Sequence, residues 1–289
     1  MTIEPNDAGH LCLSFDFDGP SLWIQRQQTT PTSVSRGEFG AVAVPRLLAL
    51  LARRAIAATF FIPGHTIETY PDVCRRIVDA GHEVALHGYA HELNTRLEPE
   101  QEAAILDRSI ELVDQLTGAP PQGYRAPSGE VTDQTLELLI SRGIRYDSSL
   151  MGHDYEPYRV RLGNRFPADG PAEWGAETEL IELPWSWTVD DYVYLEFVTF
   201  RRMLMPGLKR PDDMFANFGD DVRWMVRELQ AGVLTTVFHP QVIGRGHRLL
   251  ALERWIDDMS GLGVQFDRMD AVAQATADGV RFGVERSQP

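Results

Sequence analysis

Short apolar runs that alternate with amphipathic stretches restrict the fold of this chain more than any other feature of its sequence. Runs typical of buried strands lie at residues 11–17, 57–62, 83–86, 123–126, 146–148, 180–183 and 233–238. Apolar residues with helical spacing lie at residues 42–55, 71–80, 99–116, 132–141, 249–259 and 271–277. Repeated strand-then-helix order predicts parallel strands covered by helices. About seven such units predict an α/β fold, a distorted (β/α)7 TIM-like barrel, in preference to an open sheet.

We expect a single domain over residues 1–289, because no repeat, low-complexity tract or linker divides the chain. Two stretches interrupt the rhythm of strands and helices. Residues 20–40 are polar and rich in Gln, Thr and Ser, and residues 151–179 are rich in Gly and Pro and carry aromatics. Long loops inside a compact domain often act as lids. A tolerated surface insertion is an equally good interpretation of either stretch.

The charge and the apolar pattern exclude several functional classes. The net charge of −15 would repel a phosphate backbone, so we expect no nucleic-acid partner. No apolar run approaches the roughly 20 residues that span a bilayer. The first residues lack the basic and apolar segments of a secretory signal, so we expect a cytoplasmic location. Cys12 and Cys74 fall in apolar runs and are expected to be buried free thiols.

Two aspartates at the end of the first predicted strand indicate a charged site. Asp16 and Asp18 are two residues apart, so their side chains point to the same face of a strand. Carboxylates held side by side repel each other and need a cation or a shared proton. A solvated acidic turn after an edge strand is the alternative.

Two histidines follow the strand predicted at residues 83–86. His87 and His91 have the i, i+4 spacing that brings two imidazoles to one side of a helical turn, where both can bind one ion. One carboxylate and two histidines leave open positions on a metal, which is a catalytic pattern. A second carboxylate can then act as general base on water. The alternative is a pair of unrelated surface histidines.

Three more polar residues fall at the ends of predicted strands, where barrel enzymes gather their chemistry. Arg125 can hold the base carboxylate in a bidentate contact, and the turn after it can offer an N–H to an oxyanion. His239 can protonate a leaving amine, and Asp147 can keep that histidine charged. Each also has an ordinary interpretation: a surface arginine, a strand-end histidine and a helix cap.

The order of these motifs resembles that of the polysaccharide deacetylases, the NodB-homology group or carbohydrate esterase family 4. The chain contains Asp16-Phe-Asp18-Gly-Pro, His87 to His91, Arg125-Ala-Pro-Ser-Gly129, Asp147-Ser-Ser and His239 in the family order, between Leu11 and about Pro240. The resemblance implies a distorted barrel, a divalent metal that is usually zinc, with cobalt or nickel as alternatives, and the following roles. Asp18, His87 and His91 are metal ligands, Asp16 is the base, Arg125 its tether, His239 the acid, Asp147 its partner, and the backbone after Pro127 the oxyanion donor.

The chain departs from the family pattern at two positions. Phe17 separates the acidic pair, which is adjacent in most members, and Ser128 replaces a frequent aromatic residue. The spaced pair is similar to a cytoplasmic branch that includes peptidoglycan-deacetylase-like and allantoinase-like proteins. Both departures favour a small substrate over a long polysaccharide. The branch also resembles oligomers whose neighbours cap the pocket, so we expect a homo-oligomer.

These observations predict a metal-dependent hydrolase that removes an acetyl or formyl group from an N-acylated amino sugar or a related small amide. The alternatives are allantoinase-like hydrolysis of a cyclic ureide and non-catalytic sugar binding. Ser128, Tyr89 and Trp185 are the expected substrate-binding residues. Aromatic residues gather at Trp185, Trp187, Tyr192, Tyr194 and Phe197, and could stack on a sugar, bury a subunit interface or pack in the core.

Overall fold

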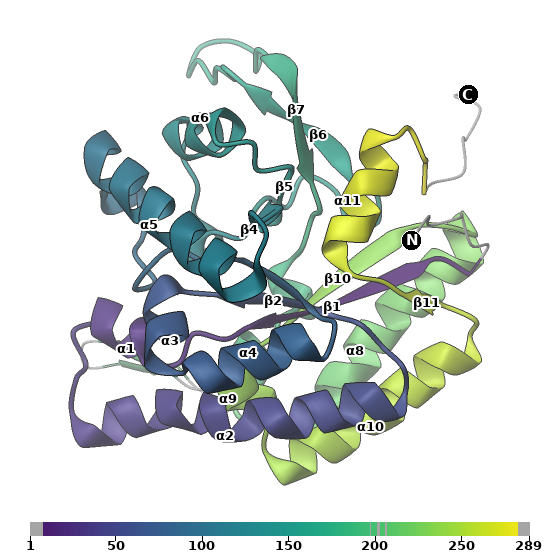
Figure 1. The fold of residues 1–289 in the computed structure, drawn as a ribbon. Coiled ribbons are helices and arrows are strands. Elements are labelled where there is room, and N and C mark those ends of the chain that lie inside the picture. Colours follow the sequence, from purple (N-terminus) through teal and green to yellow (C-terminus); the bar gives the residue numbers. More distant parts are fainter. Residues whose placement is uncertain (1–7, 197, 201–202, 206, 283–289) are drawn as a thin grey trace.

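The computed structural model describes residues 8–196, 198–200, 203–205 and 207–282 of the chain (Figure 1). Its largest sheet curls around a central space. The strands are β1 (His10–Asp16), β2 (Thr59–Ile62), β3 (Glu83–Leu86), β4 (Gly123–Tyr124), β5 (Tyr146–Asp147), β6 (Tyr158–Leu162), β7 (Ala176–Glu182), β10 (Val233–Phe238) and β11 (Gln265–Phe266), with β8 (Val198–Phe200) and β9 (Met203–Met205) in a separate hairpin.

Seven strands of the large sheet run parallel in the order β10-β1-β2-β3-β4-β5-β7. Strand β6 pairs antiparallel with β7, and β11 lies beside the start of β1. In the described residues β7 and β10 do not pair, although an isolated bridge joins Asp190 to Val237. The sheet is therefore a curled, incompletely closed barrel, and the predicted α/β fold class is confirmed.

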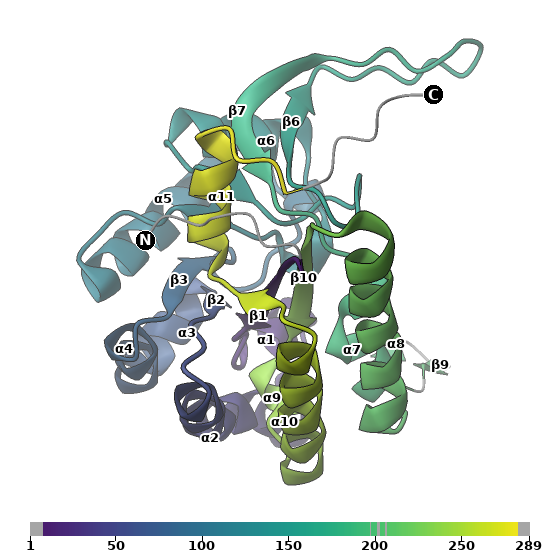
Figure 2. The ribbon, with the colours of Figure 1, turned by 90° about the vertical axis from the view of Figure 1, so that its right-hand side faces the viewer.

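Helices cover the convex side of this sheet, as Figures 1 and 2 show from two directions. The α-helices are α1 (Ser21–Gln25), α2 (Pro31–Arg53), α3 (Gly64–Thr69), α4 (Pro71–Asp79), α5 (Pro99–Thr117), α6 (Asp133–Ser141), α7 (Asp191–Leu195), α8 (Pro211–Trp224), α9 (Pro240–Ile243), α10 (Gly246–Gly261) and α11 (Met269–Ala277). Short 3₁₀ turns lie at η1 (Asn94–Arg96), η2 (Pro127–Gly129) and η3 (Trp187–Val189), and a π-helix, η4 (Met225–Leu229), continues α8.

Strand β1 shows how the sequence separates the core from the site. Its alternate residues Leu11, Leu13 and Phe15 belong to the main apolar core, whereas Cys12 belongs to a separate cluster inside the curl of the sheet. The period of two then places Ser14 and Asp16 on the same inner face as Cys12. An apolar outer face therefore fixes the strand while its inner face carries polar chemistry.

Both stretches expected as loops contain regular structure. Residues 20–40 form α1 and the first half of α2, which begins with Thr30 accepting a hydrogen bond from the N–H of Ser33. Its first turns lie so close to the turn after β1 that a Cβ on Gly37 would be 2.3 Å from the carbonyl oxygen of Gly19. Small residues that permit close contact weaken the apolar periodicity, so the first half of α2 was not predicted, whereas its second half was expected within residues 42–55.

Residues 151–179 include β6 and the first residues of β7, which form a hairpin that extends from the body of the molecule (Figure 2). Helices α3, α7 and α8 were also not predicted from the sequence. The two cysteines are buried free thiols, as expected. No helix in the described part of the chain combines the length and apolar character needed to cross a membrane.

Candidate active site and metal centre

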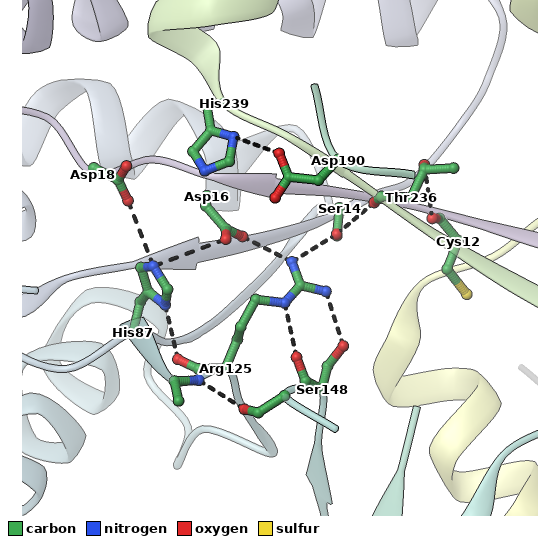
Figure 3. A network of polar contacts seen from close by, with 12 residues as sticks. Cys12, Ser14, Asp16, Asp18, His87, Arg125, Ser148, Asp190, Thr236 and His239 are labelled. Atoms are coloured by element: carbon green, nitrogen blue, oxygen red, sulfur yellow. Dashed lines mark hydrogen bonds and ion pairs between the residues drawn. The ribbon is translucent and has the colours of Figure 1, made fainter. Parts of the chain in front are cut away.

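The predicted polar residues converge on one pocket at the carboxyl ends of the parallel strands. Asp16 ends β1, His87 follows β3, Arg125 follows β4 and His239 follows β10. Parallel strands end at the same edge of a sheet, so residues that are distant in the sequence meet there. Figure 3 shows Asp16, Asp18, His87 and His239 turned towards one another across this pocket.

Three side chains direct atoms that can bind a metal towards one point. The Nε2 of His87 lies 3.5 Å from Oδ1 of Asp18, and the Nε2 of His91 lies 3.9 Å from the same oxygen. The ligand atoms of all three residues lie within 4.8 Å of one another. Each side chain is almost fully buried, with exposed fractions of 0% for Asp18, 1% for His87 and 4% for His91.

The surroundings of these three side chains favour an ion between them. Oδ2 of Asp18 accepts a hydrogen bond from Nε2 of Gln241 at 3.0 Å, whereas its buried Oδ1 has no hydrogen-bond partner in the described residues. Nδ1 of His87 lies 2.7 Å from the carbonyl oxygen of Arg125. A hydrogen on Nδ1 leaves Nε2 of His87 free as a ligand. Two imidazoles and one carboxylate with open positions fit a catalytic divalent metal.

The pKa shifts of Asp18 and His91 favour the forms that bind a metal, whereas burial of His87 is outweighed by Asp16 and Asp18, which raise the pKa of that imidazole. Burial raises the pKa of Asp18, but the neighbouring imidazoles, above all that of His87 at 3.5 Å, lower it well below its usual range. Burial lowers the pKa of His91 to about 4, so its imidazole is neutral at pH 7. A deprotonated carboxylate and a neutral imidazole are the forms that bind metals.

The His87–His91 pair differs from the predicted geometry in one respect. The two residues are linked by a turn rather than a helix, and His91 has a φ of 60°. This left-handed backbone conformation is uncommon outside glycine. It brings the ring centroids of the two histidines to 5.1 Å, with their planes nearly perpendicular. A strained turn therefore achieves the convergence that was expected from helical spacing.

Arg125 holds the second aspartate of the pair. Its Nη1 lies 2.8 Å from Oδ1 of Asp16 and also donates to Ser14, while its Nε and Nη2 donate to the carbonyl and hydroxyl oxygens of Ser148. The other Asp16 oxygen lies 3.8 Å from Nε2 of His87. Asp16 is thus oriented towards the metal ligands, although Arg125 contacts it through one nitrogen instead of a bidentate pair.

His239 has a different carboxylate partner from the one predicted. Nδ1 of His239 lies 2.8 Å from Oδ1 of Asp191, and the backbone N–H of His239 donates to both oxygens of the same carboxylate. Asp190 lies 3.8 Å from Nδ1. No described contact joins Asp147 to His239. The predicted Asp147–His239 contact is wrong, because Asp190 bridges to β10 and so brings Asp191 against the residue that follows this strand.

The carboxylates beside His239 keep its ring charged. Burial acts to lower the pKa of His239, but Asp190 and Asp191 raise it well above its ordinary value. The same three residues lie close enough to hold one ion. Because Asp191 already binds Nδ1 of the ring and Asp190 accepts the N–H of Tyr192, we interpret them as a hydrogen-bonded acid.

The three expected substrate-binding residues fall in two places. Ser128 and Trp185 line the pocket, and Ser128 has a left-handed φ of 62° in the turn Pro127–Gly129. Its backbone N–H has no acceptor in the described structure, so it is available to an oxyanion. Tyr89 lies away from the pocket lining: its hydroxyl donates to Glu68 and its ring packs under Arg108.

Several pocket residues were not singled out from the sequence. Gln241 holds Asp18, Asp190 and Asp191 hold His239, and Arg26 lines the mouth and donates to the hydroxyl of Tyr192 at 3.1 Å. The adjacent aspartates at 190–191 gave only a weak signal, because Asp-Asp pairs also stand at 212–213, 220–221 and 257–258. Of the aromatic residues, Trp187 and Tyr192 join Trp185 at the pocket, Tyr194 packs on Phe218, and Phe197 lies outside the described residues.

Known proteins resemble this chain in sequence and in fold. A family model described as polysaccharide deacetylase matches residues 5–146. A peptidoglycan deacetylase from Helicobacter pylori is 37% identical over 258 residues, covering 85% of this chain and 88% of that protein. The crystal structure of a candidate polysaccharide deacetylase from Mycobacterium smegmatis has 29% identity and a TM-score of 0.83, covering 100% of this chain and 99% of that chain.

An allantoinase crystal structure shares the fold at 22% identity, with a TM-score of 0.77 over 96% of this chain and 95% of that chain. Likeness at this level of identity concerns the fold alone. The stronger sequence matches coincide with a pocket that gathers the motifs of one enzyme family. The chain therefore belongs to the polysaccharide deacetylase family, hydrolases that cleave carbon–nitrogen bonds other than peptide bonds.

Proposed function

We propose that this protein is a metal-dependent deacylase that removes an acetyl or formyl group from an N-acylated amino sugar or a related small amide. The convergence of Asp18, His87 and His91, with the unpartnered Oδ1 of Asp18 between the two imidazoles, carries the proposal. Zinc is the expected ion, and cobalt or nickel would suit the same donors. The cavity is small, about 70 Å³, which suits an acyl group with its sugar at the mouth.

The chain supplies a base, an acid and an oxyanion donor around this centre. Asp16, tethered by Arg125, accepts a proton from the attacking water. The backbone N–H of Ser128 donates to the oxygen of the acyl group as negative charge develops there. His239, held protonated by Asp191, donates a proton to the leaving amine.

The metal, when bound, would act as a Lewis acid that lowers the pKa of water and polarises the acyl oxygen. The protein's own contribution is to exclude bulk solvent and to hold each ligand in place. Gln241 and the carbonyl of Arg125 fix the rotamers of Asp18 and His87. Hydrogen-bond partners of this kind determine the orientation and the basicity of the residues that bind a metal.

The test combines metal content with turnover in matched variants. We expect the purified protein to bind one divalent ion and to release acetate from N-acetylglucosamine oligomers or formate from a formylated amino sugar, with allantoin as the third compound of the panel, tested for ring opening. Asp18→Ala and His91→Ala should lose the ion and nearly all turnover. His153→Ala is the matched control, because His153 is exposed and bonded only within its own loop.

Each outcome distinguishes the candidate functions. Chelator-sensitive acetate or formate release supports the proposal and identifies the acyl group. Turnover of allantoin alone, unaffected by a chelator, supports hydrolysis of a cyclic ureide. A bound ion with no turnover across the panel supports sugar binding without catalysis. Full activity in Asp18→Ala would contradict the proposed role of the metal. A cytoplasmic location and assembly into a homo-oligomer stay predictions.

A further inference from the structure

A second pair of carboxyl groups lies buried behind the catalytic pocket. Asp147 on β5 and Glu182 on β7 are direct partners in the parallel register, and both have an exposed fraction of 0%. No ion pair with a basic side chain involves either residue in the described structure. Two ionised carboxylates in a site without a paired cation would repel each other and lack solvation.

Each carboxyl group uses one oxygen to bind the segment that follows β5. Oδ1 of Asp147 accepts from the hydroxyl of Ser149 at 2.7 Å, and Oε1 of Glu182 accepts from the N–H groups of Ser149 and Leu150, each at 3.0 Å. The remaining oxygens, Oδ2 of Asp147 and Oε2 of Glu182, find no protein donor in the described residues. The parallel register places the two side chains next to each other on the same face of neighbouring strands.

This segment holds the turn that carries the oxyanion donor. The hydroxyl of Ser149 accepts the backbone N–H of Ala126 at 2.8 Å, and Ser148 accepts from the guanidinium of Arg125. Ala126 directly precedes the turn Pro127–Gly129. The carboxyl pair is thus connected through Ser149 to the tether of the base and to the backbone N–H of Ser128.

We infer that Asp147 and Glu182 share one proton and act together as positioning residues for the turn that stabilises the oxyanion. The shared proton lets the pair carry a single negative charge and joins their two free oxygens by a hydrogen bond. Burial raises the pKa of both groups, to about 6 for Asp147 and well above the ordinary value for Glu182. The titratable and charged groups that face the pair are Arg125, Tyr124 and Tyr158.

The kinetic test uses amide substitutions, and this arm rests on the proposed function. In Glu182→Gln the new amide N–H can donate to Asp147, and in Asp147→Asn it can donate to Glu182, so each single variant should keep most of kcat. The double variant either sets two amide donors against each other, or turns the amide of residue 147 towards the hydroxyl of Ser149, which then loses the acceptor for its own proton. Its kcat should fall about tenfold or more with KM little changed, because the turn acts on the transition state.

A second test needs no substrate and applies even if the double variant does not fold. At pH 7 the folded pair binds one proton that the unfolded chain, with carboxyl pKa values near 4, has released. The wild-type unfolding constant should therefore rise relative to Glu182→Gln by about tenfold per pH unit above roughly pH 5. The measurement is urea unfolding of both proteins between pH 5 and pH 8.

The outcomes separate this inference from the proposed function. Parallel pH dependence of stability in wild type and Glu182→Gln would overturn the shared proton, whatever the enzyme hydrolyses. Additive losses in the two single variants, with no extra loss in the double variant, would overturn the pairing. If no amide in the panel is hydrolysed, the proposed function fails, and the unfolding measurement still decides whether the pair shares a proton.

Discussion

Asp16 and Asp18 illustrate how neighbours assign different tasks to two identical side chains. Asp16 is the last residue of β1, and Asp18 follows it by two residues. Asp16 is paired with Arg125, whereas Asp18 is held by the amide of Gln241 and faces two imidazoles. A guanidinium contact orients a carboxylate, while an unpartnered carboxylate oxygen between two imidazoles is placed to bind a metal. Environment, rather than residue type, therefore separates the proposed base from the proposed metal ligand.

Replacing Asp191 with Asn should move the alkaline limb of the activity profile to lower pH. A general acid must be protonated, so activity is lost as the pH rises through the raised pKa of His239. Removing the charge of Asp191 lowers that pKa, and the protonated form is then lost at lower pH. The measurement is kcat/KM as a function of pH for the wild type and the variant.

Asp147→Asn is the matched control for this experiment. It changes a buried carboxyl group that has no described contact with His239. Its alkaline limb should stay at the wild-type position. A limb that moves in Asp147→Asn but not in Asp191→Asn would restore the role that the sequence assigned to Asp147.

At the scale of single residues, the sequence predicted those site positions that follow directly from strand alternation and strand ends. Asp16, Asp18, His87, Arg125 and His239 all occupy the pocket as expected. Asp191 could not be predicted in the same way. Its position depends on the isolated bridge between Asp190 and β10, a pairing that leaves no periodic pattern in the sequence.

The turn Pro127–Gly129 is the element that carries the proposed oxyanion donor. Gly129 has a φ of +69°, and a Cβ there would lie 2.7 Å from Cζ2 of Trp185. Gly118, at the end of α5, has a φ of +80° with no atom within 4 Å of a Cβ. The two glycines therefore share a backbone conformation but differ in their surroundings.

Alanine substitutions at these two positions should distinguish the effect of backbone strain from the effect of displacing the turn Pro127–Gly129. Gly118→Ala is expected to lose about 1 kcal/mol of unfolding free energy and to keep kcat/KM, because only the left-handed backbone is strained. Gly129→Ala should lose at least as much stability and about tenfold or more in kcat/KM, because Trp185 and the turn must move apart. Equal kcat/KM in the two variants, measured beside urea unfolding, would show that the contact with Trp185 has no role in activity.

Elements with a strong apolar period were predicted well, and those fixed by close backbone contact were not. The sequence indicated α5 and β10 within a residue of their observed ends. The first half of α2 escaped prediction because Gly37 and Gly40 replace the large apolar residues that mark a buried helical face. Short helices such as α3 and α7 depend on tertiary contacts, which outweigh their weak local preference.

At the scale of the whole molecule, metal binding should stabilise the fold. The ligands come from the ends of two strands, β1 and β3, so an ion links segments that are distant in sequence. Zinc at a hundred times its dissociation constant adds about 2.7 kcal/mol to the unfolding free energy. For a chain of this size that corresponds to a rise in Tm of roughly 5 °C or more.

Scanning calorimetry with and without zinc measures this shift, and His91→Ala should abolish it. His153→Ala should retain it. An unchanged Tm in the wild type, with zinc shown to be bound, would mean that the unfolded chain binds the ion equally well. Acidification should reduce the shift, since protons compete for the histidine nitrogens.

Arg125 serves the site through two chemically independent groups on one residue. Its guanidinium holds Asp16, and its carbonyl oxygen receives Nδ1 of His87. Substitution changes the first group and leaves the second in place, because every amino acid brings the same carbonyl. Under the proposed function, metal binding and catalysis should therefore respond differently to a single substitution of Arg125. Such a variant loses the tether of Asp16 and retains the carbonyl contact that orients His87.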